Sequence, residues 1–259
     1  MLRLARDLSG YKLSARDGEI GKVQEFYFDD QSWAVRYLIA DTGDWLTGRQ
    51  VLISPYSLDP CREDPKVVPV DLTRKQIENS PSLEAHKPVS RQYELQYYPY
   101  YGLPAYWDGP YMWGAGPYPE IGSGWSEKIH HTGTDDPHLR STNDVSGRTI
   151  QAQDGEIGHV DDFVVDDEVW AIRYLIVDTR NWWPGKKVLI STRWIERISW
   201  EEAKVFISLT RETIKHAPEY TEEALITRDY EKKLHRHHNR EGYWLTEAPG
   251  RERKILVDR

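Results

Sequence analysis

Residues 16–54 read RDGEIGKVQEFYFDDQSWAVRYLIADTGDWLTGRQVLIS, and residues 153–191 read QDGEIGHVDDFVVDDEVWAIRYLIVDTRNWWPGKKVLIS. The offset between the two stretches, 153 minus 16, is 137 residues. The same offset relates residues 2–107 to residues 139–244 without a gap. Self-similarity at a fixed offset is typical of a duplicated structural unit. The chain is therefore two copies of one domain.

Each copy has the pattern of a small all-β domain. Asp17-Gly18 lies between two extended stretches, which predicts a tight hairpin turn with positive φ. The predicted strand from Trp33 to Thr42 is apolar on both of its faces, so both faces need a cover. We expect one face to line a barrel interior and the other to lie under a tail helix or the sister copy. Ser90 and Thr227 are predicted N-caps of these tail helices.

The predicted fold class is mainly β, with two tandem small β-barrels, each followed by a short helical tail. Five or six short strands within about 80 residues, separated by Gly and Asp turns, favour a small closed barrel. We expect the two units to pack around a pseudo-twofold axis. The predicted divisions are barrel 1 at 1–81, its tail at 82–107, a Gly/Pro/aromatic linker at 108–137, barrel 2 at 138–218, its tail at 219–244, and a charged C-terminal tail at 245–259.

Composition and charge exclude several classes of protein. The net charge is −8, so the chain lacks the basic stripe on which nucleic-acid binding depends. One cysteine, Cys61, cannot form an internal disulfide framework, which fits a cytoplasmic location. No stretch approaches the roughly 18–20 apolar residues of a membrane span. Peripheral association with a membrane stays open.

The sequence resembles the PRC-barrel family. The residues that carry the resemblance occur in both copies, and in the first they are Gly10, Asp17 to Gly21, Val23, Trp33 to Thr42, Val51 to Ser54 and Leu72 to Ile77. Members include the cytoplasmic domain of the photosynthetic reaction-centre H subunit and the C-terminal domain of a ribosome-maturation factor. The resemblance implies that each unit is a compact, SH3-like PRC β-barrel without catalytic residues of its own. The two-copy arrangement looks like that of stand-alone bacterial members.

Two polar features interrupt the apolar pattern. Arg36 and Arg173 lie inside otherwise apolar strands, where a buried guanidinium needs a carboxylate partner. We expect a structural pair with Asp41/Asp178 or Glu19/Glu156. The doubled aspartates that precede the same strands have no third ligand spaced for Ca²⁺, and they are predicted to form solvated turns. These aspartates are Asp29, Asp30, Asp166 and Asp167.

No residues predict an enzyme, a metal site or a cofactor. The cluster His235, His237 and His238 corresponds at the same offset to Tyr98, Tyr100 and Tyr101, which indicates an aromatic packing face instead of a ligand set. The chain has no nucleophile motif and no glycine-rich phosphate loop. Binding of a metal or a small ligand is the weakest of the alternatives.

The predicted function is a non-catalytic module for protein–protein interaction or scaffolding. Exposed aromatic rings are common anchors of protein interfaces, although each ring here can instead fold over its own barrel. Self-association of whole chains stays open. The alternative function is a peripheral accessory subunit of a membrane electron-transfer complex, which only the resemblance supports. The candidate partner-binding residues are Trp45, Trp182, Trp183, Tyr106, Trp107, Tyr243 and Trp244.

Overall fold

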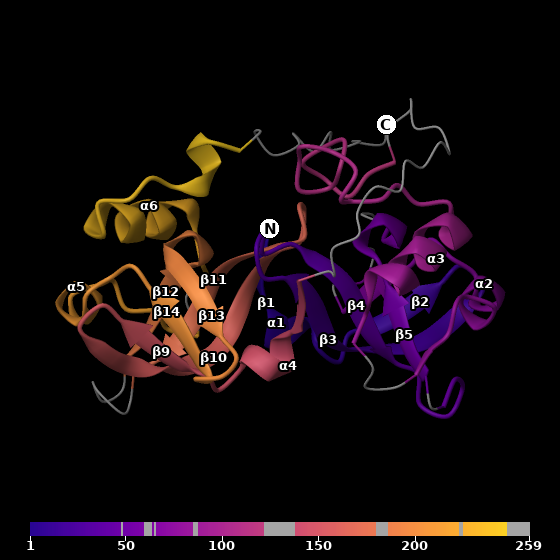
Figure 1. The fold of residues 1–259 in the computed structure, drawn as a ribbon, viewed down its shortest axis with the longest axis horizontal. Coiled ribbons are helices and arrows are strands. Elements are labelled where there is room, and N and C mark those ends of the chain that lie inside the picture. Colours follow the sequence, from indigo (N-terminus) through magenta and orange to yellow (C-terminus); the bar gives the residue numbers. More distant parts are fainter. Residues whose placement is uncertain are drawn as a thin grey trace.

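The structure is a computed structural model. It describes residues 1–47, 49–59, 64, 66–84, 88–121, 138–179, 186–222 and 225–247. Two β-barrels lie side by side, and each carries a tail helix (Figure 1). Within the described residues each barrel is built on a sheet of seven strands, more than the five or six predicted.

The first repeat follows the order strand, helical turn, six strands and tail helix, with short helices between the later strands. Its strands are β1 (Leu2–Leu4), β2 (Lys12–Ala15), β3 (Gly18–Asp29), β4 (Val35–Asp41), β5 (Arg49–Ile53), β6 (Val67–Pro69) and β7 (Leu83–Glu84). Its helices are α1 (Ala5–Leu8), η1 (Pro55–Ser57), α2 (Arg74–Glu78) and α3 (Arg91–Tyr101).

The second repeat has the same order up to its fifth strand, after which β13 and β14 both precede α5 and no strand lies between α5 and α6. Its strands are β8 (Leu139–Ser141), β9 (Thr149–Ala152), β10 (Gly155–Asp166), β11 (Ala171–Asp178), β12 (Lys187–Ser191), β13 (Ile195–Ser199) and β14 (Lys204–Ile207). Its helices are α4 (Thr142–Val145), η2 (Thr192–Trp194), α5 (Arg211–Lys215), α6 (Arg228–His237) and η3 (Tyr243–Leu245).

The first strand of each repeat belongs to the sheet of the other repeat. β1 pairs antiparallel with β10, with Leu2 opposite Asp166, and β8 pairs with β3, with Leu139 opposite Asp29. Both exchanges have the same register, because Leu139 and Asp166 follow Leu2 and Asp29 by the repeat offset. The two repeats are therefore joined by reciprocal strand exchange around a pseudo-twofold axis, as the duplication predicts.

The second glycine of the DGEIG motif is required by close packing between neighbouring strands. Gly158 has φ +145, and a Cβ atom there would lie 2.0 Å from the carbonyl oxygen of Asp178 on β11. A Cβ atom at Gly21 would lie at the same distance from the carbonyl oxygen of Asp41. Side chains other than glycine do not fit such an approach.

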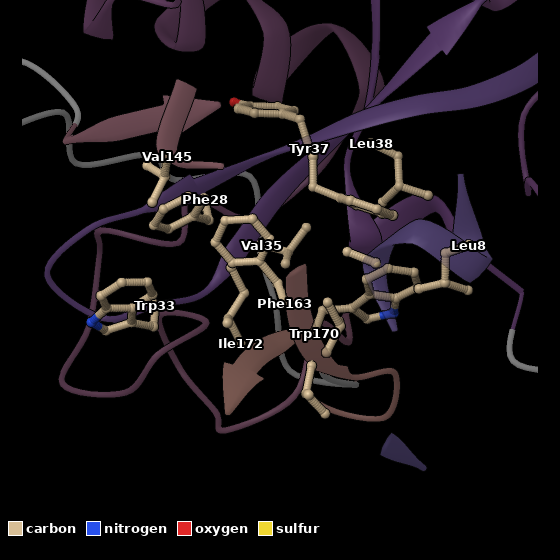
Figure 2. Close-up of a cluster of buried hydrophobic side chains, with 14 of the residues drawn as sticks. Leu8, Phe28, Trp33, Val35, Tyr37, Leu38, Val145, Phe163, Trp170 and Ile172 are labelled. Carbon is tan, nitrogen blue, oxygen red and sulfur yellow. The ribbon is translucent and has the colours of Figure 1, made fainter. Parts of the chain in front are cut away.

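The two repeats share one hydrophobic core at their junction. Phe28 of β3 and Phe163 of β10 have ring centroids 6.1 Å apart (Figure 2). The backbone N–H of Val35 donates to the carbonyl oxygen of Trp170, and the N–H of Ile172 donates to the carbonyl oxygen of Trp33. Figure 2 shows these side chains from both repeats gathered in one cluster. A core of this kind makes independent motion of the barrels costly.

The predicted strand Trp33–Thr42 begins two residues later than expected. Trp33 has φ +59, a left-handed conformation that places it in the turn before β4. Its indole stacks on Phe28, with ring centroids 5.1 Å apart. From Val35 to Ala40 every residue of β4 is buried. Tail helix α3 covers its outer face, since Tyr37 contacts Tyr97 edge-on at 5.4 Å. Both covers proposed from the sequence, tail helix and sister copy, are thus present.

The predicted caps of the tail helices are confirmed. The Ser90 Oγ accepts a hydrogen bond from the N–H of Tyr93, and the Thr227 Oγ accepts one from the N–H of Tyr230. Each tail helix lies on the barrel of its own repeat: α3 on β4 and α6 on β11, where Glu231 contacts Tyr174.

Candidate functional site

The buried arginine of the first repeat pairs with a carboxylate, as expected, but the carboxylate belongs to the turn before its own strand and the named partners were wrong. Arg36 is 3 % exposed, and its Nη2 lies 3.3 Å from the Asp29 carboxylate instead of near Asp41 or Glu19. Its Nη1 donates to the carbonyl oxygen of Met112 at 2.6 Å. Asp29 meets it because the β3–β4 hairpin places the end of β3 diagonally opposite Arg36.

The equivalent arginine of the second repeat has an additional carboxylate. Arg173 lies 3.3 Å from Asp166, which corresponds to Asp29, and 2.7 Å from Glu247. Glu247 also lies 3.0 Å from Arg193. One carboxylate near the end of the described chain therefore bridges two guanidinium groups on the surface of the second barrel.

The doubled aspartates do not form solvated turns. Asp30 and Asp167 pair with Arg140 at 2.9 Å and Arg3 at 2.6 Å, respectively. Each of these arginines lies on the exchanged strand of the other repeat, and the Asp167 side chain is only 6 % exposed. The acidic turns were mispredicted because their partners come from the sister copy, which hairpin chemistry alone does not place.

A buried carboxylate cluster joins each tail helix to its barrel. Glu94 is fully buried, and its carboxylate accepts hydrogen bonds from Tyr37 at 2.7 Å, Tyr106 at 3.1 Å and Arg91 at 2.7 Å. Burial raises the pKa of Glu94 to about 7, although Arg91 and the two hydroxyl groups oppose that rise. Every polar contact of this group stays inside the repeat, so we assign it to helix docking.

The second repeat has the same cluster, formed by Glu231 with Tyr174, Tyr243 and Arg228. Sequence reasoning gave Glu94 and Glu231 no part in a site. The signal that could have found the cluster is the recurrence of all four of its residues at the same offset. A glutamate on the helix face that is otherwise apolar is the second sign of burial.

Most of the candidate partner-binding aromatic residues contact their own repeat. Tyr106 and Tyr243 are each 5 % exposed and belong to the carboxylate clusters. Trp107 and Trp244 are partly buried beside them, with the guanidinium groups of Arg91 and Arg228 at 4.0 Å and 4.5 Å. Trp45 is partly buried beneath Arg74 at 4.6 Å, whereas Trp182 and Trp183 lie outside the described residues.

The histidines of the second tail helix are packing residues. His235 and His238 are buried, and their rings lie 5.0 Å and 4.8 Å from the ring of Trp194. Burial lowers the pKa of His238 to about 4. His237 contacts the backbone oxygen of Thr213 at 2.8 Å. In the part of the chain that the structure describes, no group of three His, Cys, Asp or Glu residues is placed to hold a metal ion.

The described part of the predicted linker is a strap across the junction. Trp113 is 1 % exposed and packs edge-on against Tyr56, with ring centroids 5.2 Å apart. Its indole Nε1 donates to the carbonyl oxygen of Val169, in the turn of the second repeat, at 2.7 Å. The Tyr56 hydroxyl donates to the carbonyl oxygen of Trp113 at 2.8 Å. Residues 108–121 thus tie the two repeats together.

A cavity of about 430 Å³ lies beside this strap, at Met112. One wall is the turn of the first repeat, and the other is the surface of the second barrel, with Met112 of the strap between them. Its size lies within the usual range for ligand pockets. The cavity is lined by Asp30, Gln31, Ser32, Trp33, Met112, Ala171, Ile172, Arg173, Thr192, Arg193, Ile195, Glu196, Arg197, Ile198 and Glu247.

Comparison with known families identifies the domain. The family model of the PRC-barrel domain matches residues 2–77 and again residues 138–213. The chain belongs to the PRC-barrel family. The two matched ranges of this PRC-barrel protein begin with the two exchanged strands, so each range contributes its first strand to the sheet of the other. No curated protein is similar enough in sequence to match the chain.

None of the helices in the described ranges has the length and apolar character needed to cross a lipid bilayer. The cavity, the buried clusters and the strap are the features of the described residues that bear on function.

Proposed function

We propose that this PRC-barrel protein is a non-catalytic interaction module that binds a partner protein at the junction cavity. The observation that carries the proposal is the cavity itself, whose walls come from both repeats and which adjoins the strap. Pockets that receive an anchoring side chain are the energetic centres of many interfaces. A site with walls from both repeats requires that the repeats be held together, and the strand exchange holds them.

The charges around the cavity suit binding without catalysis. The Arg173 guanidinium is 6 % exposed and is held by Asp166 and Glu247, so its orientation is fixed. Arg193 and Arg197 are more exposed at the rim. Arginine is enriched in interface hot spots because its planar group stacks on rings and pairs with carboxylates.

The test compares the full chain with a variant in which the cavity is filled. Ile198→Trp adds a ring to a partly buried wall residue, and Gln96→Trp adds the same ring to the exposed face of α3 as the control. Each protein is cross-linked in lysate, and captured proteins are identified by mass spectrometry. We expect a partner that the wild type and Gln96→Trp capture and Ile198→Trp does not. A partner retained by Ile198→Trp refutes the cavity as the binding surface.

The loops that carry Trp45 and Trp182–Trp183 are the second surface that we propose for a partner, on the strength of their sequence. The same capture experiment with Trp45→Ala tests them. Loss of the partner in this variant alone moves the site from the cavity to the loops.

A second candidate function is that of a peripheral subunit at a membrane surface, and the outward face of α6 favours it. Lys232, Lys233 and Arg236 are exposed there, whereas the corresponding residues of α3 are Leu95, Gln96 and Pro99. Basic residues near an anionic lipid surface contribute about 1 kcal/mol each. The single Cys61 fits the cytoplasmic side of such a membrane.

Sedimentation with lipid vesicles tests this candidate. The wild type is expected to sediment with vesicles that contain phosphatidylserine and to remain in solution with phosphatidylcholine alone. The triple variant Lys232→Glu, Lys233→Glu and Arg236→Glu should lose that binding, while Gln96→Glu on α3 should keep it. Equal sedimentation of the triple variant excludes α6 as the docking face.

A further inference from the structure

The junction has two equivalent sites, and the chain fills one of them with its own tryptophan. The indole of Trp113 lies against Tyr56 and beneath the guanidinium of Arg36, 4.9 Å from the ring centroid, and it donates to the carbonyl oxygen of Val169. These three contact residues come from both repeats. Trp113 is thus a side chain bound in a pocket between the barrels.

The open cavity is the pseudo-twofold mate of that pocket. At the repeat offset of 137 residues, Val169 corresponds to Ser32, Tyr56 to Arg193, and Arg36 to Arg173. All three corresponding residues line the cavity. The mate of the Trp113 pocket is therefore the cavity, with an arginine where the filled pocket has Tyr56.

In the cavity, a carboxylate of the chain replaces the polar groups of the strap, but no aromatic ring of the described chain replaces Trp113. In the filled pocket, Arg36 and Tyr56 donate to the carbonyl oxygens of Met112 and Trp113. In the cavity, Arg173 and Arg193 both donate to the carboxylate of Glu247. This carboxylate takes the place of the two strap carbonyl groups.

The residue at the position that corresponds to Trp113 is Gly250, which has no side chain. The sequence from Ala248 to Arg259 contains no aromatic residue at all. Residues 248–259 therefore offer no ring of their own, whereas the strap places the ring of Trp113 in the sister pocket.

We propose that the cavity binds the indole ring of a tryptophan that a partner protein presents, which rests on the function proposed above. The ring occupies the position that Trp113 holds in the sister pocket, and its N–H donates to the carbonyl oxygen of Ser32. The guanidinium of Arg173 lies over one face of the ring, as that of Arg36 lies over Trp113. Arg193, in place of Tyr56, adds a second cation that attracts an electron-rich ring.

The methionines of the chain provide a specific reporter. There are two, Met1 and Met112, and only Met112 lines the cavity. With ¹³C-labelled methionine methyl groups, N-acetyl-tryptophanamide is titrated into the full chain. We expect a ring-current shift of the Met112 resonance with a Kd on the order of 0.1–1 mM, while the Met1 resonance stays in place.

Two further probes define the recognition. N-acetyl-1-methyltryptophanamide lacks the indole N–H, and its binding should be about tenfold weaker because one hydrogen bond is lost. N-acetyl-leucinamide lacks the ring and should produce no saturable shift. Equal affinity of the methylated probe overturns the assignment of Ser32 as the acceptor.

Two protein variants decide between sources of the ring. Ile198→Trp fills the cavity and should abolish the shift, while Gln96→Trp should preserve it. Trp125→Ala removes the indole of residues 122–137, which lie outside the described residues. Binding by the wild type and Trp125→Ala alike supports a partner's ring, whereas binding by Trp125→Ala alone overturns it, because the linker's own indole then fills the cavity.

The outcomes separate this inference from the proposed function. If neither the wild type nor Trp125→Ala binds the probe, the indole inference is wrong, even where Ile198→Trp has lost a captured partner and the proposed function stands. If the probe binds but the captured partner is retained by Ile198→Trp, the proposed function is wrong, and the cavity remains an indole site without that partner.

Discussion

Replacing Trp113 by alanine should destabilise the whole chain and not only the strap. The substitution removes a ring that is 1 % exposed and deletes the hydrogen bond to Val169 of the other repeat. Truncation of a buried tryptophan costs about 3–5 kcal/mol. For a chain of this size, 1 kcal/mol corresponds to roughly 2–4 °C in Tm, so Trp113→Ala should lower Tm by about 10 °C.

Urea unfolding followed by circular dichroism measures this change. Trp45→Ala is the control, because that ring is only partly buried and is expected to contribute about 1 kcal/mol or less through Arg74. A loss below about 1 kcal/mol for Trp113→Ala refutes the view that the strap is part of the junction core.

The same variant tests the equivalence of the two pockets. Trp113→Ala opens the sister pocket, so free indole should bind there and raise the stability of the variant, as a ligand of the folded state must. We expect partial recovery of Tm at millimolar indole. The absence of recovery indicates that the pocket collapses once its ring is removed.

Four further predictions concern stability. Glu94→Gln should remove the loss of roughly 3 kcal/mol that this one carboxyl group contributes as pH rises from about 4.5 to 7, where the unfolded chain releases a proton that folded Glu94 keeps; the difference in urea unfolding between variant and wild type across this range checks it. His238→Tyr should remove a contribution of opposite sign, the stability lost as pH falls from 6.5 towards 4 because buried His238 resists protonation, and the two contributions offset each other in the wild type; a slope unchanged by the substitution contradicts this reading. Gly158→Ala should cost at least about 2 kcal/mol in thermal unfolding, because its Cβ would meet the carbonyl oxygen of Asp178, whereas Gly147→Ala, with open space around it, should cost less. Deleting residues 1–4 should increase hydrogen exchange in β10 and leave β3 protected, since β1 pairs with β10; faster exchange in β3 alone would exclude the strand exchange.

The parts of the fold that depend on local pattern could be predicted from the sequence. The offset of 137 residues gave the two units, and the caps at Ser90 and Thr227 were found because a side-chain oxygen before a helical stretch has a local signature. The doubly apolar strand at 33–42 correctly required two covers. The caps and the apolar strand are set by neighbouring residues, so a single copy is enough to reveal them, whereas the offset needs both copies.

The exchange of strands could not be predicted in the same way. Residues 2–4 and 139–141 can pair with β3 or with β10, because the duplicated sequence offers either strand the same backbone hydrogen bonds. The choice depends on chain connection and on the shared core. The doubled aspartates were wrongly predicted to form solvated turns because the exchange brings Arg140 and Arg3 to them. The partner of Arg36 follows instead from the β3–β4 hairpin of its own repeat.

The candidate site was the least predictable feature. At the repeat offset the counterpart of Trp113 is Gly250, and this difference in sequence has meaning only once the ring of Trp113 is known to be buried. Sequence reasoning instead gave weight to rings such as Tyr106 and Tyr243, which the structure shows inside their own repeats.

Reciprocal pairing of β1 and β8 has a consequence for synthesis on the ribosome. β3 leaves the ribosome early, yet its edge is completed only when residues 139–141 have followed. At about 5–20 residues per second, that edge stays unpaired for several seconds. During this interval it can pair with the β8 segment of a neighbouring nascent chain, since identical backbone groups are offered. We therefore expect polysomes that translate this message densely to yield more intertwined dimers than slow initiation does.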